Sequence, residues 1–343
     1  MVGAVGEARA TRDGTGRRRV TIVDVAQHAG VSTAAVSKVL RDAYGVSPQM
    51  RTRVRDAMDT LGYRPSVGAR GMRGATYTIG VSSLDPDNPF FAMLLEGVVA
   101  EMDDAGYRVL VTIEGAHGGD ELETARSLVD RQMDGLILIT PCLPAADLDQ
   151  LAAKVPIVLL GRHGEGDVYD SVASDDAAGS RLAVQHLVER GHRRIVYHTQ
   201  PVRAPGLPEL FREAGYREAM TEHGLRPDVV EGSWTQQGGE ALAELIFARR
   251  RRPTAVHAGA DVAAFGVLTH LWHHDLSAPD DLAVAGCDDT PSAAMTPIGL
   301  TSVDQQAIAM GREAARLLLS RITRPGTGTH TLFPPRLAVR TST

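Results

Sequence analysis

The hydrophobic positions at the start of the ordered pattern recur at helical spacing. From Thr21 onward, apolar side chains stand three or four residues apart, at Ile22, Val25, Ala26 and Ala29. This spacing places them on one face of a helix, and Gly30 then supplies a break. The pattern predicts one short helix that ends near residue 29. Residues 1–20 show no such periodicity, and we expect a disordered lead-in there.

Two further helices are predicted within the next thirty or so residues. Ser32 is a suitable cap for a second helix, and Ser47 followed by Pro48 is a typical start of a third. The apolar positions of these two helices are Val36, Val39 and Leu40, then Val54, Ala57, Met58 and Leu61. Residues 21–63 therefore read as a small all-α domain of three helices.

The first two of these helices have the pattern of a helix-turn-helix. Ala26 and Ala29 are small enough for two helices to cross closely, and Gly30 can adopt the turn. The second helix would then point its N-terminal residues outward. Those residues are Thr33, Ala34, Ser37 and Lys38. Hydroxyl and ammonium groups suit bases and phosphates in a DNA major groove, although any three-helix bundle shows similar periodicity.

From Tyr77 the pattern changes to short β-rich runs that alternate with amphipathic helical stretches. We expect strands at 77–81, 108–113, 135–139, 156–160, 194–198, 255–258 and 282–286. Helical stretches lie near 90–105, 120–131, 176–189, 209–223, 237–248, 261–274 and 305–321. This alternation predicts α/β units with parallel sheets, and its length suffices for two doubly wound lobes. A ligand cleft is expected beyond the carboxyl ends of the strands.

Charge divides the chain into a basic head and an acidic body. Residues 1–76 contain thirteen Lys and Arg residues against six Asp and Glu residues, whereas the remainder contains 23 against 36. This division of charge is typical of a protein that binds a polyanion through its N-terminal part and not through its body. A solvated basic tail is the alternative, because Arg17, Arg18 and Arg19 contribute to the excess.

Composition excludes several classes of protein. With 43% hydrophobic and 23% charged residues, the chain has the composition of a globular protein. It shows neither a membrane-spanning apolar run nor a signal peptide, so we expect it in the cytoplasm. Cys142 and Cys287, the only cysteines, have no metal-ligand spacing. We therefore predict neither a metal nor a cofactor.

Three segments of the chain strongly resemble the lactose-repressor (LacI) family of transcriptional regulators. The first is DVAQHAGVSTAAVSKVL followed by VSPQMRTRVRDAMDTLGYRPS. The others are SDDAAGSRLAVQHLVERGHRRI at 174–195 and VAGCDDTPSAAMTPIGLTSVDQQAIAMGREAARLLLSRI at 284–322. The resemblance implies a helix-turn-helix head and a periplasmic-binding-protein-like body. It implies a first effector lobe of 76–173 and 304–325, and a second of 174–303 and 326–343.

The resemblance also implies roles in DNA binding. Base reading would fall to Thr33, Ala34 and Lys38, and phosphate contacts to Thr21, Ser32 and Ser37. Residues 64–75 correspond to a hinge that inserts into the minor groove, with Ala69 and Met72 at the inserting positions. Gly68 and Gly71 each disfavour a helix by about 1 kcal/mol relative to Ala, so a flexible linker is the alternative. We expect this hinge to order only on DNA.

Several body residues resemble the family's effector contacts. They are Phe90, Phe91, Arg162, Arg181, Tyr216 and Asp288, with Trp234 a further candidate. Each has an ordinary structural alternative, such as a core aromatic ring or a surface salt bridge. Ala260 and Cys287 depart from the family pattern, and one polar ligand contact is expected to be missing at Ala260. Guanidinium, carboxylate and aromatic groups suit a sugar, while a nucleoside or a sugar phosphate stays open.

Two other functions fit parts of the chain. The acidic pairs Asp175-Asp176 and Asp288-Asp289 could imitate the carboxylates of an α/β enzyme, but neither a nucleophile elbow nor a P-loop accompanies them. A solute-binding protein would fit the body without its head. We predict instead a homodimeric regulator, acting as a repressor, of a pseudo-palindromic double-stranded operator. The sequence leaves open whether the effector is an inducer or a corepressor.

Overall fold

The structure is a computed structural model of the 343-residue chain. It describes residues 20–40, 44–63, 75–83, 87–113, 120–164 and 166–343. The chain forms two compact units, Met1–Gly74 and Ala75–Thr343. The lead-in at 1–20 and the hinge at 64–75 lie outside the described residues, except for Val20 and Ala75. The predicted minor-groove residues Ala69 and Met72 are therefore not described.

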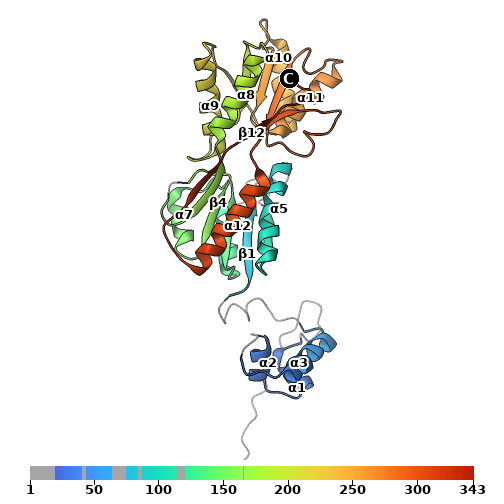
Figure 1. Cartoon of the computed structure of the whole chain (residues 1–343), viewed down its shortest axis with the longest axis vertical. Coiled ribbons are helices and arrows are strands. Elements are labelled where there is room, and N and C mark those ends of the chain that lie inside the picture. The colour runs from blue at the N-terminus through green and yellow to red at the C-terminus, as the bar shows by residue number, and fades with distance from the viewer. Residues whose placement is uncertain (1–19, 41–43, 64–74, 84–86, 114–119, 165) are drawn as a thin grey trace, which may run out of the picture. The chain divides into compact units, whose positions relative to one another are not determined.

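Within its described residues, the first unit contains three helices whose ends are set by local capping. They are α1 (Ile22–Ala29), α2 (Thr33–Leu40) and α3 (Pro48–Leu61), drawn in blue in Figure 1. Thr21 and Asp24 form a capping box at the start of α1. Gly30 ends this helix with φ of 65°, and the N–H of Val31 donates to the carbonyl of Ala26. This tight left-handed turn confirms the predicted break between the first two helices.

Small and β-branched side chains form the core of this unit. Val25 and Ala26 of α1 pack against Val36 of α2 and Val54 of α3, and all four are buried. The packing partners are the apolar positions that the helical spacing placed inward. The expected helix-turn-helix is therefore present.

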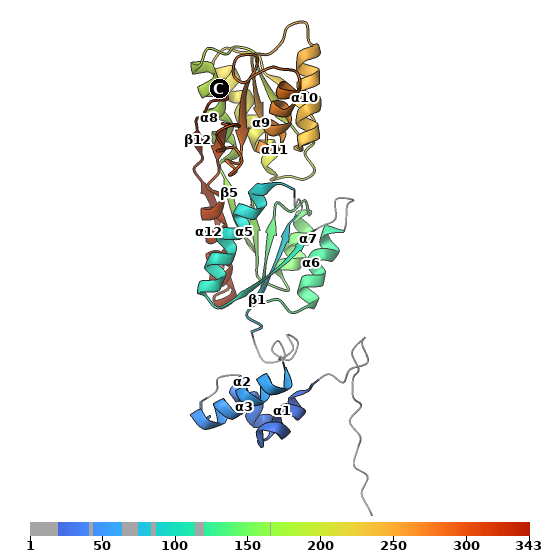
Figure 2. The ribbon, with the colours of Figure 1, turned by 90° about the vertical axis from the view of Figure 1, so that its right-hand side faces the viewer.

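The second unit consists of two lobes, each built around a six-stranded sheet (Figures 1 and 2). The first sheet has the order β11-β5-β4-β3-β1-β2, and all of its pairings are parallel. Its strands are β1 (Thr78–Ser83), β2 (Arg108–Ile113), β3 (Gly135–Ile139), β4 (Ile157–Leu160), β5 (Asp170–Ser174) and β11 (His330–Phe333).

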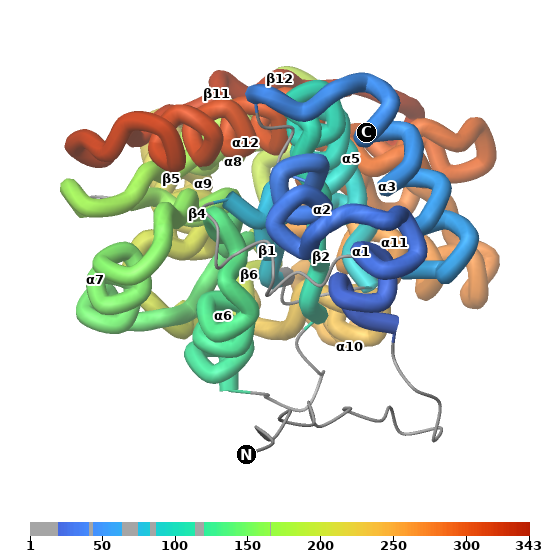
Figure 3. The backbone as a smooth tube through the Cα atoms, turned by 90° about the horizontal axis from the view of Figure 1, so that it is seen from below, coloured from blue at the N-terminus to red at the C-terminus, as the bar shows by residue number. Residues whose placement is uncertain are grey.

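Helices cover both faces of this first sheet. Helices α5 (Pro89–Asp104) and α12 (Ala307–Thr323) lie side by side on one face, and α6 (Glu121–Asp130) and α7 (Ala145–Ala152) lie on the other, as Figure 3 shows. Leu94 and Met310 are buried in the core between α5, α12 and the sheet, and Leu128 is buried on the opposite face. The nearly continuous apolar strands thus have cover on both sides, as a parallel sheet requires.

The second sheet has the order β12-β10-β9-β8-β6-β7, and only the edge strand β12 is antiparallel among its pairings. Its strands are β6 (Ile195–Thr199), β7 (Asp228–Glu231), β8 (Ala255–Ala258), β9 (Ala283–Cys287), β10 (Thr301–Asp304) and β12 (Arg336–Ala338). One face carries α8 (Asp176–Glu189) and α9 (Pro208–Glu222), and the other carries α10 (Gln236–Ala248) and α11 (Asp261–His273). The expected two-lobed α/β body is present.

The chain crosses from the first lobe to the second for the last time at a later position than we expected. We assigned 326–343 to the second lobe, but β11 pairs in parallel with β5 of the first sheet. The chain enters the second lobe only at Pro334–Pro335, before β12. Because exposed and half-buried residues alternate in β11, its sequence lacks the apolar run that would mark a sheet strand. Among the described residues, no helix is both long and apolar enough to span a membrane.

Candidate functional site

Helix α2 of the head exposes the three side chains expected to read bases. Thr33, Ala34 and Lys38 are all exposed, while Val36 and Val39 are buried on the opposite side of the helix. Residues i, i+1 and i+5 share one helical face, so a single groove can admit all three. The structure brings the predicted base-reading residues together.

The predicted phosphate contacts have local structural roles. The hydroxyl of Ser32 accepts the N–H of Ala35 at 3.1 Å, which leaves its own hydrogen to donate. The hydroxyl of Thr21 instead donates to Asp24 Oδ2 at 2.8 Å. Ser37 is half-buried. Ser32 is thus well arranged for a phosphate, whereas Thr21 must first release Asp24.

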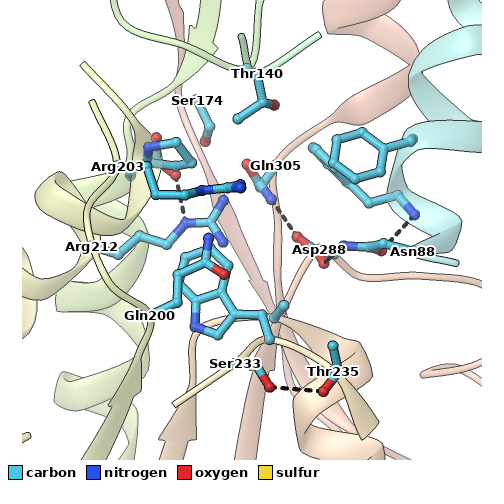
Figure 4. Close-up of a pocket in the computed structure, with 17 residues that line it drawn as sticks. Asn88, Thr140, Ser174, Gln200, Arg203, Arg212, Ser233, Thr235, Asp288 and Gln305 are labelled. Carbon is cyan, nitrogen blue, oxygen red and sulfur yellow. Dashed lines mark hydrogen bonds and ion pairs between the residues drawn. The ribbon is translucent and has the colours of Figure 1, made fainter. Parts of the chain in front are cut away.

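A pocket of about 160 Å³ lies between the two lobes of the body (Figure 4). Its lining residues follow the carboxyl ends of strands in both sheets, where parallel strands place ligand sites. From the first lobe come Asn88, Phe90, Phe91, Thr140, Gly161 and Ser174, from the second come Asp176, Gln200, Arg203, Pro208, Arg212, Ser233, Trp234, Thr235, Ala260 and Asp288, and Gln305 follows β10. The expected cleft is therefore present.

Three aromatic side chains line this pocket. Phe90 and Phe91 begin α5, where Asn88 caps the helix by accepting the N–H of Phe90 at 3.0 Å. Their rings meet edge to face, with centroids 6.0 Å apart. From the second lobe, the Trp234 indole N–H donates to the carbonyl of His198 at 3.2 Å. These predicted residues provide flat apolar surfaces from both lobes.

Asp288 lines the pocket and is almost completely buried. Its carboxylate accepts hydrogen bonds from Gln305 Nε2 at 2.6 Å and from Asn88 Nδ2 at 3.4 Å. Burial raises the pKa of Asp288 to about 8, although the neighbouring Arg212 opposes the rise. Its φ of 126° lies in a region that side chains rarely adopt. Strain and burial at a polar pocket residue are typical of a binding site.

Arg212 is one of several pocket residues that the sequence reasoning missed, with Asn88 and Arg203 among the others. Its Nε donates to Asp176 Oδ1 at 2.7 Å, another of its nitrogens donates to the carbonyl of Gly259, and the guanidinium lies over the Trp234 ring at 5.1 Å. The signal was present in the sequence, because Arg212 stands three and four residues before Gly215 and Tyr216. That spacing puts an arginine on the buried face of α9.

Three predicted effector contacts do not line the pocket, and these predictions are corrected. Arg162 is buried and donates to the carbonyls of Pro141 and Leu143, both at 2.7 Å. Arg181 forms a half-exposed ion pair with Glu218 on the surface of the second lobe. Arg181 therefore has the surface salt bridge that was its alternative, whereas Arg162 has neither predicted role, because it is buried and bonds backbone carbonyls.

Tyr216 is the third residue that does not line the pocket. Its side chain is fully buried beneath α9, where its hydroxyl donates to the carbonyl of Ile195 at 2.8 Å and accepts the N–H of Asp228 at 2.9 Å. The aromatic ring stacks on Tyr197, with centroids 5.1 Å apart. It ties α9 to the sheet instead of touching a ligand.

The two departures from the family pattern have different consequences. Ala260 lines the pocket with a methyl group, so that position supplies no polar contact, as expected. Cys287 is buried beside Ala183 and Val303, away from the pocket lining. The residue at position 260 therefore changes the pocket lining itself, whereas Cys287 changes only the packing behind it.

Comparison with protein-family models gives two matches. Residues 21–66 match the bacterial regulatory proteins of the lacI family, and residues 184–343 match a periplasmic binding protein-like domain. The first match covers the helix-turn-helix, and the second covers most of the second lobe and the end of the chain.

Known proteins resemble the chain over almost its full length. The ribose operon repressor of Escherichia coli (strain K12) is 34% identical over 315 residues, which cover 89% of this chain and 94% of that protein. The structure of a CelR–cellobiose complex shows 30% identity and a TM-score of 0.71, covering 95% of this chain and 100% of that one. A lac repressor dimer bound to operator and the anti-inducer ONPF shows 27% identity, a TM-score of 0.78 and coverage of 95% and 99%.

The head and the two-lobed body agree with these relatives in kind and in order along the chain. The family's helix-turn-helix binds DNA, and its body binds a small-molecule effector. The chain therefore belongs to the lacI family of bacterial regulatory proteins and is a DNA-binding transcriptional regulator with an effector-binding domain, not an enzyme.

Proposed function

We propose that the effector is a sugar and that it binds in the interlobe pocket. The observation that carries this proposal is that Asp288 and Arg212 line one pocket together with the rings of Phe90 and Trp234. A carboxylate and a guanidinium suit neighbouring hydroxyls, and aromatic rings suit the apolar face of a sugar ring. Relatives named for ribose and bound to cellobiose support the same class.

On the DNA side, we infer that Lys38, Thr33 and Ala34 read base edges in a major groove. The ammonium of Lys38 is the strongest polar donor on this exposed face, and Ala34 suits a thymine methyl group. Ser32, Ser37 and Thr21 would contact phosphates. Met72 and Ala69, which lie outside the described residues, would act in the minor groove.

The proposed assembly is a homodimer on a pseudo-palindromic operator. A single head buries too little surface to select one site in a genome, so a two-fold pair is required. Apolar side chains on the edge strand β2 offer a surface for a second copy, with Leu110 and Ile113 exposed by 41% and 60%. A related lac repressor is a dimer on its operator. Because the operator lies on the chromosome, the protein would act in the cytoplasm, as a repressor.

A ligand screen tests the sugar proposal. Thermal unfolding of the full chain should be followed with ribose, cellobiose, other mono- and disaccharides, nucleosides and sugar phosphates. We expect added sugar to raise the melting temperature of the wild type. The melting temperature of Arg212→Met should be the same with and without the sugar. Stabilisation by nucleosides alone would overturn the proposed class of effector.

The affinity for operator DNA, measured with and without each stabilising compound, then shows whether that compound weakens or strengthens DNA binding. The ligand favours whichever state binds it more tightly, so an inducer weakens the DNA complex and a corepressor strengthens it. Arg181→Met is the matched control, because Arg181 is an arginine of the same lobe that lies outside the pocket. A sugar that raises the melting temperature without altering operator affinity would contradict an effector role.

A further inference from the structure

His163 belongs to the first lobe but is held by the second. It lies in the connection between β4 and β5, yet its ring stacks on Phe211 of α9, with centroids 3.8 Å apart and planes 18° apart. The backbone N–H of His163 also donates to the carbonyl of Gly206 at 2.9 Å. Its side chain is only 14% exposed. The stacking and the backbone hydrogen bond thus join the lobes at one residue.

The imidazole of His163 also reaches a carboxylate that faces the pocket. Its Nε2 lies 2.8 Å from Asp176 Oδ2, and Asp176 Oδ1 accepts the Nε–H of Arg212 at 2.7 Å. Asp176 is the first residue of α8, where the helix dipole favours a negative charge. Both oxygens of one buried carboxylate are therefore occupied, one by each lobe.

Separation of the lobes would break this arrangement on one side only. Asp176 and Arg212 both belong to the second lobe and would stay together, whereas His163 would leave with the first lobe. A buried carboxylate that loses one of its two partners becomes free to rotate, or must take up water. The position of Arg212 over Trp234 therefore depends on where the first lobe lies.

We propose that His163 is a positioning residue that couples lobe closure to the effector pocket. By holding one oxygen of Asp176, it orients the other toward Arg212 and keeps the guanidinium over Trp234. A change in the position of the first lobe would then alter the pocket through Arg212, the same arginine that the proposed sugar contacts. Only the ligand-binding part of this inference depends on the proposed function.

The chain contains two tryptophans, which allows a test without any ligand. In a Trp272→Phe background, Trp234 is the sole tryptophan and reports the arginine that lies over its ring. His163→Phe keeps an aromatic ring for Phe211 but removes the partner of Asp176, whereas His163→Gln keeps a donor without the ring. His330→Phe is the control, because His330 contacts Ser171 and Gly166 within the first lobe.

We expect acrylamide quenching of Trp234 to rise in His163→Phe, to rise less in His163→Gln, and to stay at the background value in His330→Phe. Circular dichroism and thermal melting identify any variant that fails to fold. Equal quenching in folded His163→Phe and His330→Phe would overturn the proposal. Unchanged quenching in His163→Phe with a rise in His163→Gln would overturn it too, since stacking alone would then position Arg212.

Titration with ribose and with cellobiose adds the ligand-dependent arm. For whichever sugar binds the background protein, we expect His163→Phe to weaken affinity by about tenfold, the effect of losing one charge-assisted hydrogen bond. Rescue of most of this loss by His163→Gln would identify the hydrogen bond as the cause. If neither sugar binds the background protein, the proposed effector class is in question while the quenching result still decides the role of His163.

Discussion

The carboxylate of Asp288 in the second lobe accepts a hydrogen bond from the side-chain amide of Asn88 in the first lobe. Asn88 also caps α5, so the same residue orients Phe90 and reaches across the pocket. This contact and the one made by His163 start from different strands of the first sheet, since Asn88 follows β1 and His163 follows β4. The two lobes therefore meet through polar groups that a ligand must either keep or replace.

Replacement of Asp288 by Asn should change how stability depends on pH. The pKa of Asp288 is raised to about 8 by burial, so the folded state holds a proton that the unfolded state releases near pH 4. Its contribution to stability is present below pH 4 and is lost as pH rises through about 8. Relative to wild type, Asp288→Asn should gain at least about 1 kcal/mol of unfolding free energy between pH 5 and pH 8.5.

Urea unfolding at both pH values measures this difference, with the exposed Asp103→Asn as the control. A gain that is the same at both pH values would contradict the buried-carboxyl explanation. We also expect Asp288→Asn to weaken sugar binding above pH 8, where the wild-type side chain is a carboxylate with two acceptor oxygens and the amide offers only one.

Acid should destabilise the second lobe through two buried histidines. Burial lowers the pKa of His198 and of His257 to about 4, whereas an unfolded histidine takes up its proton near pH 6.5. Their contribution to stability is therefore complete above pH 6.5 and is lost as pH falls toward 4. Each histidine accounts for up to about 3 kcal/mol over this range.

Chemical denaturation from pH 7.5 to pH 4.5 should show a shallower loss of stability in His257→Gln than in wild type. Any loss of packing in the variant is constant with pH and so does not alter this slope. His223→Gln, at an exposed histidine, should follow the wild-type slope. Parallel slopes in all three proteins would show that His257 is not neutral in the folded state.

Lys38→Ala should cost about 1–3 kcal/mol of operator affinity and relax the preference at one base pair. The side chain is exposed on the face of α2 that also carries Thr33 and Ala34. Binding to a set of operators with single substitutions, at fixed salt, separates base reading from phosphate contact. An equal loss on every sequence would make Lys38 a phosphate contact. Lys154→Ala, in the body, is the control.

Close packing of α5 and α12 makes Gly97 intolerant of a side chain. A Cβ at this position would lie 2.1 Å from the carbonyl oxygen of Ile308, and one at Gly311 would lie 2.1 Å from that of Leu94. Both obstacles are backbone atoms, which cannot rotate away. Gly97→Ala should therefore destabilise the first lobe by about 1–3 kcal/mol.

Thermal unfolding measures this effect, and Gly326→Ala is the matched control because open space surrounds that glycine. We expect the control to keep the wild-type melting temperature within the error of the measurement. A melting temperature for Gly97→Ala that equals that of the control would show that the two helices separate at little cost.

Much of the fold was predictable from local features of the sequence. Capping residues such as Ser32 and Ser47, together with apolar spacing, predicted the three head helices. Apolar strands such as β3 and β4 were predicted because both faces of a parallel strand are buried. Strands with polar composition escaped this reasoning: β5 (DSVAS), β7 (DVVE) and β10 (TSVD) carry too few apolar residues to be recognised as buried strands.

The candidate pocket was predicted in part. Residues directly after strand ends or at a helix start, such as Asp288 and Phe90, were correctly placed because the chain itself carries them to the edge of a sheet. Arg212 was missed and Arg162 was wrongly chosen, although both are arginines near strand ends or helices. Which guanidinium enters the pocket depends on carbonyls and carboxylates contributed by distant segments.

The sequence by itself determined the helix-turn-helix, the alternation of strands and helices, and the family to which the chain is similar, because these depend on neighbours within one or two helical turns. Only the tertiary structure decided that β11 joins the first sheet, that Arg212 faces the pocket, and that Asn88 and His163 reach the second lobe. Each of these contacts joins residues that the chain separates, and only the packing of two complete lobes brings them within hydrogen-bonding distance.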